Sequence, residues 1–169
     1  VFGLALQADS AVVAVGAFTF VEGAPHGHVC RVKFDGTLDT TFNTTAFSDV
    51  YAVAIQDDGK IVIGGAFTDV SGNGRSRIAR LLTNGVVDSG FFPTVDGFVY
   101  ALAVEPDGDI LLGGDFANVD STPRANVARV SIFGVLDGSF TPNPDAQVQK
   151  LEDMNDRVNR TLAVYLANT

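Results

Sequence analysis

The sequence contains few of the residues on which several protein classes depend. Its 169 residues include one cysteine, one methionine and no tryptophan, and only 18% are charged. The single cysteine, Cys30, excludes an internal disulfide and a cysteine-based metal site. No apolar run approaches the ~18 residues of a membrane helix, so we expect no membrane span. The apolar start follows no basic region and is interpreted as structure, not as a signal peptide.

Positive charge is also scarce. The chain has 11 Lys and Arg residues against 20 Asp and Glu residues, which gives a net charge of -9. Nucleic acids and anionic membranes both require a concentrated basic surface, so we expect neither as a partner. Glycine, in contrast, is abundant at 18 residues, and 46% of the chain is apolar. This composition is typical of an all-β domain with many tight turns, not of a disordered chain.

Three copies of one 49-residue unit fill most of the chain without insertion or deletion. Val1, Val50 and Val99 begin the copies. Further positions identical in all three copies are Gly16, Gly65 and Gly114; Phe18, Phe67 and Phe116; Arg31, Arg80 and Arg129; Gly36, Gly85 and Gly134; Asp39, Asp88 and Asp137; and Phe42, Phe91 and Phe140. So strict a period predicts one supersecondary unit per copy, which buries its apolar face against its neighbours. We expect a β domain over residues 1–147, divided into 1–49, 50–98 and 99–147.

The second copy indicates how one unit is built. Residues 50–56 alternate between two largely apolar faces, which predicts a strand buried on both sides. Asp58-Gly59 predicts a two-residue hairpin turn of type I′, in which both residues have positive φ. Further strands are expected at residues 60–67, 77–82 and 86–91, so that each copy is a four-stranded antiparallel unit.

One Arg and one Asp recur in each copy, and we expect them to pair. Arg80 would bind Asp88, with the same pairing in the other copies, and so hold the third strand to the fourth. Cys30 aligns with Ala79 and Ala128, which predicts a small buried position.

Long motifs in the copies resemble those of the delta-sixty repeat family. The second copy reads VYAVAIQDDGKIVIGGAF and then RSRIARLLTNGVVDSGF; the third reads VYALAVEPDGDILLGGDF and then RANVARVSIFGVLDGSF. The first copy departs from the pattern at Ser10, Val15 and His26. The resemblance covers residues 1–147. It implies β-propeller blades, an extracellular, cell-surface or virion location, and no catalytic motif.

Three copies leave two architectures open. Propellers usually have about four to eight blades, so either two chains join to give six blades or the chain belongs to a longer protein. A β-trefoil also consists of three four-stranded units in one closed domain. The motifs favour the propeller and the number of copies favours the trefoil; the propeller is our main prediction.

The repeat pattern ends after Val148, because Glu152 and Asp153 occupy positions where apolar residues are expected. Residues 148–169 are predicted to form an amphipathic C-terminal helix, which packs on its own domain or on other subunits. Its apolar stripe, a candidate oligomer interface, consists of Val148, Leu151, Met154, Val158, Leu162 and Tyr165. Alternatively, residues 162–166 form a strand.

The loop after the second strand of each copy supplies candidate ligand contacts. These are His26, His28, Arg75, Arg77, Arg124 and Asn126. The two histidines could share a metal ion, but no third ligand is evident and their counterparts are not ligands, so no metal site is predicted. No nucleophile with a base and no phosphate-binding loop stands out, so neither a catalytic residue nor a cofactor is predicted.

Together these features predict a non-enzymatic structural or recognition module. It would be a subunit of a larger surface or virion assembly, either fibre-like or a surface component, formed by self-association or with other proteins. The alternative is a carbohydrate-binding module of trefoil type, with a glycan bound by the loops of the copies.

Overall fold

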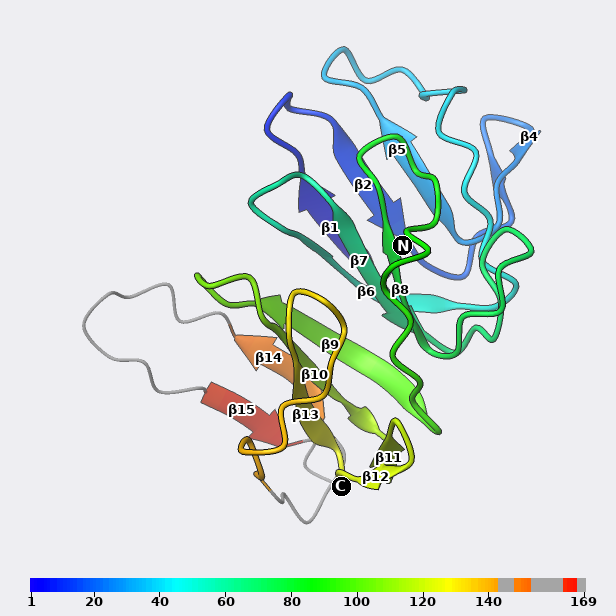
Figure 1. Cartoon of the computed structure of the whole chain (residues 1–169). Helices are drawn as coiled ribbons and strands as arrows, with labels where there is room; N and C mark the ends of the chain where they lie inside the picture. Colours follow the sequence, from blue (N-terminus) through cyan, green and yellow to red (C-terminus); the bar gives the residue numbers. More distant parts are fainter. Residues whose placement is uncertain (143–147, 153–162, 167–169) are drawn as a thin grey trace.

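A computed structural model of the chain consists of short antiparallel strands, of which a set of three recurs in the same order three times (Figure 1). The structure describes residues 1–142, 148–152 and 163–166. These residues include no helix, and so none that is long and apolar enough to cross a membrane. The strands are β1 (Gly3–Leu6), β2 (Val12–Val15), β3 (Phe20–Val21), β4 (Ala24–Pro25), β5 (Val29–Val32), β6 (Val50–Ile55), β7 (Ile61–Gly65), β8 (Ile78–Leu81), β9 (Phe98–Val104), β10 (Ile110–Asp115), β11 (Asn118–Val119), β12 (Thr122–Pro123), β13 (Val127–Val130), β14 (Val148–Glu152) and β15 (Ala163–Leu166).

Each copy of the unit forms one three-stranded sheet, which we call a blade. The strand order is β1-β2-β5 in blade 1, β6-β7-β8 in blade 2 and β9-β10-β13 in blade 3. The prediction of a full fourth strand is wrong, because a single bridge takes its place; in blade 2 the bridge joins Leu81 to Val87. The chain then turns away because the Asp88 carboxylate accepts the backbone N–H of Gly90 at 2.9 Å.

The first hairpin of a blade is one residue longer than predicted. In blade 2 the N–H of Gly59 donates to the carbonyl of Gln56, and Gly59 alone in this turn has a positive φ, +82°. This is a three-residue loop with a type I turn followed by a left-handed glycine. The type I′ prediction is wrong because the Asp58 carboxylate accepts the N–H of Lys60 at 3.1 Å, which favours the observed turn.

The blades pack face to face, and their first strands lie side by side near the centre of the molecule (Figure 1). We call the face that meets the preceding blade the leading face, and the opposite face the trailing face. The first hydrophobic cluster joins the trailing face of blade 1 to the leading face of blade 2, and the second joins blade 2 to blade 3 in the same way. Most of the core therefore lies between blades, and a third, smaller cluster lies in blade 3.

The recurring Arg–Asp pairs form as predicted and also connect neighbouring blades. Nitrogen–oxygen distances are 2.9 Å for Arg80 with Asp88 and 2.5 Å for Arg31 with Asp39. The third pair, Arg129 with Asp137, also lies at 2.5 Å. Arg31 additionally donates to the Thr83 carbonyl of blade 2 at 2.6 Å, and Arg80 donates to the Ile132 carbonyl of blade 3. Each of these two arginines thus holds its own blade together and attaches it to the next.

The C-terminal region differs from its prediction. Val148–Glu152 and Ala163–Leu166 are the paired antiparallel strands β14 and β15, so the predicted helix over 148–169 is wrong for these residues. The alternative prediction of a strand over residues 162–166 is confirmed for Ala163–Leu166. β14 follows β9 at the 49-residue step and lies beside it, so packing on the sheet overrides the helical spacing. Val148 and Leu151 lie in β14 and Tyr165 in β15. The other predicted stripe residues, Met154, Val158 and Leu162, lie outside the described residues.

Candidate functional site

The structure divides the six predicted ligand contacts into two groups. His26, Arg75 and Arg124, which occupy one position of the unit, serve their own blades. His26 is 7% exposed. Arg75 donates to the Asp88 carbonyl at 3.4 Å, and Arg124 donates to the Gly138 carbonyl at 3.0 Å. We interpret these contacts as support for the outer loops of the blades.

Arg124 additionally borders a small hollow in blade 3. The hollow has a volume of about 270 Å³ and is lined by Ala117, Pro123, Arg124, Ala125, Thr141 and Pro142. Arg124 is the charged member of this lining, and its guanidinium already donates to two backbone carbonyls, those of Pro123 and Gly138. The hollow therefore presents few polar groups with which a ligand could form hydrogen bonds.

His28, Arg77 and Asn126 form the second group, next to the first strands of the blades. All three have left-handed backbones, with φ of 66°, 67° and 66°, which is uncommon outside glycine. His28 Nδ1 lies 3.4 Å from a carboxylate oxygen of Asp49, and the Arg77 guanidinium lies 4.9 Å from the centre of the Phe98 ring. Since Asp49 and Phe98 directly precede Val50 and Val99, these two contacts reach from one blade to the next.

A row of aromatic rings crosses the first strands of the three blades. Phe2, Tyr51 and Tyr100 occupy the same position of the unit. Ring centres are 5.7 Å apart for Phe2 and Tyr51 and 5.2 Å apart for Tyr51 and Tyr100. Phe98 joins them, 6.4 Å from Tyr51 and 6.1 Å from Tyr100. We call these four residues the aromatic row.

β-Bulges orient the two tyrosines of the row. The register of β6 with β7 shifts between Val50 and Ala52, at Tyr51, and that of β9 with β10 shifts opposite Tyr100. A bulge changes the direction in which the side chain of its extra residue points, compared with a regular strand. Glycine permits this close approach: a Cβ on Gly65 would lie 2.3 Å from the Asp49 carbonyl oxygen, and one on Gly114 would lie 2.0 Å from that of Phe98.

The aromatic row combines exposed ring surface with polar groups. Phe2 is 57% exposed and Phe98 is 38% exposed, while the tyrosines are half-buried. Burial, followed by the negative charge of Asp115, raises the pKa of Tyr100, so its phenol remains a neutral hydrogen-bond donor at physiological pH. The carboxylates of Asp115 and Asp49 remain accessible at the edge. Such a surface suits a neutral ligand with both an apolar face and hydroxyl groups.

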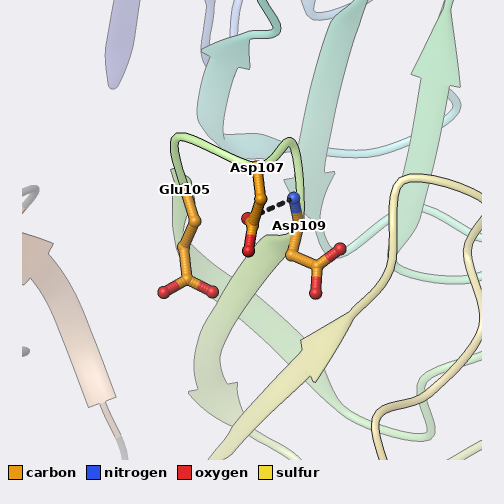
Figure 2. A group of neighbouring side chains, drawn as sticks. All are labelled: Glu105, Asp107 and Asp109. Carbon is orange, nitrogen blue, oxygen red and sulfur yellow. Dashed lines mark hydrogen bonds between the residues drawn. The ribbon is translucent and has the colours of Figure 1, made fainter.

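Three carboxylates gather on the first hairpin of blade 3 (Figure 2). Ligand oxygens of Glu105, Asp107 and Asp109 lie within 4.8 Å of one another. Each carboxylate has an internal partner: Glu105 pairs with Arg129 at 3.3 Å, and Asp107 and Asp109 accept the backbone N–H groups of Asp109 and Ile132. Since Ca²⁺ takes roughly six to eight oxygen ligands, we interpret this cluster as support for the hairpin.

The blades and their packing define a repeat protein of the β-propeller class. The chain belongs to the family described as "Domain of unknown function (DUF5122) beta-propeller", which it matches three times, over residues 7–42, 56–91 and 105–140. One match falls in each copy of the 49-residue unit. The family thus decides between the two predicted architectures in favour of the propeller, and the trefoil is not retained.

Solved structures with a similar fold include two of virginiamycin B lyase from Staphylococcus aureus. One is a catalytically inactive variant with quinupristin, with 16% sequence identity and a TM-score of 0.50. The other is the selenomethionine-substituted enzyme, with 15% identity and a TM-score of 0.50. Each comparison covers 89% of this chain and 44% of that chain, so this chain spans less than half the length of the lyase. At such identities the likeness concerns the fold alone. No curated protein matches the sequence.

Proposed function

We propose that the protein is a non-enzymatic recognition module that binds carbohydrate at the aromatic row. The observation that carries this proposal is the recurrence of an aromatic residue at one position of all three blades, with the rings in contact across the first strands. Rings held in a row by the backbone present a flat apolar platform at little cost in side-chain entropy. A sugar ring carries apolar C–H faces that fit such a platform.

The charge around the row supports a neutral sugar over other ring-shaped ligands. Nucleotides and nucleic acids carry negatively charged phosphate groups along with their bases. The net charge of -9 and the nearby Asp49 and Asp115 repel these phosphates. The same carboxylates, with the phenols of Tyr51 and Tyr100, suit the hydroxyl groups at the edge of a sugar ring.

The finer family assignment and the biological setting belong to the same proposal. The motifs after Val50 and Val99 favour a delta-sixty repeat protein. On that resemblance, the module acts outside the cell, on a cell surface or in a virion, as a structural or recognition subunit of a larger assembly.

Tyrosine fluorescence provides a direct test, because the chain has three tyrosines and no tryptophan. We would titrate the full chain with neutral cello-, xylo-, malto- and chito-oligosaccharides. Stacking of a sugar on Tyr51 or Tyr100 is expected to change the emission with a saturable dependence on concentration. The variant Phe2→Ala/Phe98→Ala removes two exposed rings and should weaken binding by about tenfold or more.

The matched control is Phe34→Ala/Phe133→Ala. These phenylalanines are 81% and 74% exposed and lie in turns away from the row, so their removal should leave the titration unchanged. No saturable change with any of the four oligosaccharide series, or an equal loss in both double variants, would contradict carbohydrate binding at the aromatic row.

A further inference from the structure

Two Asn-Gly pairs occur in the chain, Asn73-Gly74 and Asn84-Gly85, and each lies in or next to a turn of blade 2. An asparagine followed by glycine is chemically labile. Glycine has no side chain to hinder its own backbone nitrogen when that nitrogen attacks the side-chain carbonyl carbon of the asparagine. The structure places the two pairs in different surroundings, so it indicates which of them can react.

Asn84-Gly85 is held in place by its neighbours. The Gly85 N–H donates to the Leu82 carbonyl at 2.9 Å. The Asn84 side-chain oxygen accepts the Val86 N–H at 3.1 Å. Gly85 is buried, and its carbonyl accepts the hydroxyl of Thr44, from the preceding copy of the unit, at 2.6 Å. Attack by the Gly85 nitrogen requires these contacts to open.

Asn73-Gly74 is open. Both residues are exposed, and apart from the adjoining residues nothing lies within 4 Å of a Cβ built on Gly74. Among the residues that the structure describes, the Gly74 N–H has no hydrogen-bond acceptor. The side-chain nitrogen of Asn73 donates to the carbonyls of Val70 and Ser71, at 3.3 and 3.0 Å. These two bonds hold the nitrogen that would leave, not the Gly74 nitrogen that would attack.

The other two blades indicate that the N–H at this position takes no part in the fold. The residue equivalent to Gly74 is Pro25 in blade 1 and Pro123 in blade 3, and proline has no N–H. Both prolines lie in short strands, β4 and β12. A backbone nitrogen without a structural partner is therefore a property of this position of the unit. Blade 2 combines it with a preceding asparagine, whereas blades 1 and 3 have alanine and threonine there.

We infer that Asn73 is a site of spontaneous deamidation and that the fold protects Asn84 from the same reaction. The Gly74 nitrogen loses its proton and forms a bond to the side-chain carbonyl carbon of Asn73. The bond from that carbon to the side-chain nitrogen breaks, and ammonia leaves with the proton. Water, the one co-reactant, then opens the cyclic imide at either of its carbonyls. The product is aspartate or isoaspartate in place of Asn73.

The modification lies next to the connection between blades 1 and 2. Ser71 donates its N–H to the Thr45 carbonyl at 2.8 Å, and its hydroxyl accepts the Thr45 N–H at 3.1 Å. Thr45 belongs to the segment that leads from β5 to β6. Deamidation adds one negative charge, and the isoaspartate form also adds a methylene group to the backbone near these bonds. We therefore expect faster hydrogen exchange at the Ser71 and Thr45 amides of the modified chain.

Peptide mapping of the full chain after incubation in mildly alkaline buffer tests the inference. Trypsin cleaves after lysine and arginine, so it places the two Asn-Gly pairs in different peptides, 61–75 and 81–124. In the folded protein, the gain in mass from amide to carboxyl should accumulate about tenfold faster or more at Asn73 than at Asn84, because the contacts of Gly85 must first open. In guanidinium chloride, where the fold is lost, the two pairs should react at similar rates.

Gly74→Pro introduces the residue that blades 1 and 3 have at this position, so circular dichroism should show an unchanged β fold. It removes the attacking N–H and should abolish the modification of Asn73. If this variant unfolds, Gly74→Ala replaces it and should slow the reaction several-fold, since its methyl group fits the open space but hinders attack. The matched control Asn84→Gln should leave the rate at Asn73 unchanged.

Three results would each overturn the inference. The first is equal rates at Asn73 and Asn84 in the folded chain. The second is an unmodified Asn73 in the folded chain over a time in which the unfolded chain reacts. The third is modification of Asn73 at the wild-type rate in the folded Gly74→Pro variant, or in Gly74→Ala where that variant replaces it.

Discussion

Blades 1 and 2 have apolar residues at the same positions, but blade 2 buries several of them more completely. Ile61 is 0% exposed between the two blades, whereas Val12, its counterpart in blade 1, is half-buried. The difference comes from the neighbour and not from the blade itself, because blade 2 packs on blade 1 while blade 1 has no described partner on that side. A blade of this type is thus a unit whose stability is completed by an adjoining unit.

The glycine turns show the same contrast in the backbone. Gly36 and Gly85 have nearly the same left-handed conformation, with φ of +84° and +89°. Only Gly85 lies against a ring of the preceding blade, that of Phe42. Glycine is therefore favoured in blade 1 by the positive φ alone. In blade 2 it is favoured both by the positive φ and by the close approach of the Phe42 ring.

The largest effect on the free energy of unfolding is expected from truncating the apolar side chain at the same position of the two blades. Ile61→Ala should lower the free energy of unfolding by about 2–5 kcal/mol, because it leaves a cavity between blades. Val12→Ala should lower it by less than about 1.5 kcal/mol, since Val12 already contacts solvent. Urea unfolding would measure both, at a protein concentration at which the chain is monomeric.

Ile110→Ala is the control for that comparison. Ile110 occupies the same position in blade 3 and is also 0% exposed, so its loss should match that of Ile61. Equal losses for Val12, Ile61 and Ile110 would show that burial between blades does not decide stability.

A smaller difference is expected between Gly36→Ala and Gly85→Ala. Both substitutions place a side chain at positive φ, which costs about 1–2 kcal/mol. Gly85→Ala also presses a methyl group against Phe42, which is fully buried, and overpacking adds about 1–3 kcal/mol. Thermal and urea unfolding of the two variants should separate these contributions. Identical losses would mean that the Phe42 ring can move aside.

The sequence predicted features that repeat within one blade more successfully than contacts between blades. The Arg–Asp pairs and the buried Cys30 follow from residues that recur at fixed positions, and the structure confirms both. The hydrogen bond from Arg31 to Thr83 was not predicted, because it depends on how one blade is rotated against the next. That rotation has no signal in the spacing of apolar residues.

The candidate site shows the same limit. The loop residues were selected because they are polar and recur, but Arg75 and Arg124 bind backbone carbonyls of their own blades. The aromatic row was missed although Phe2, Tyr51 and Tyr100 recur visibly, because a strand with two apolar faces gives no indication that a bulge turns one residue outward. The C-terminal helix was wrong for residues 148–152 and 163–166 because a spacing of three or four residues also occurs by chance in short strands.

The smallest predicted effect concerns a hydroxyl group that blade 1 has and blade 2 lacks. Thr41 donates through its hydroxyl to the Asp39 carboxylate at 2.7 Å, whereas the equivalent residue in blade 2 is Gly90. This hydrogen bond, with a further contribution from Arg31, lowers the pKa of Asp39 from 3.8 to about 2. Because the pKa is lower in the folded state, the stabilisation is fully present above pH ~4 and is lost as the pH falls towards 2.

Thr41→Ala should therefore lower the free energy of unfolding by about 1–2 kcal/mol above pH 4, near the lower end for a hydrogen bond to a charged group because Thr41 is exposed. The difference from the wild type should shrink as the pH falls from 4 towards 2, because Asp39 becomes protonated in both proteins. Urea unfolding at several pH values measures this, and NMR titration should show the pKa of Asp39 rising towards 3.8 in the variant. Thr40→Ala, at the adjacent exposed threonine, is the control. A Thr41→Ala difference that stays constant over this range would assign the effect to packing of the threonine and not to the charge of Asp39.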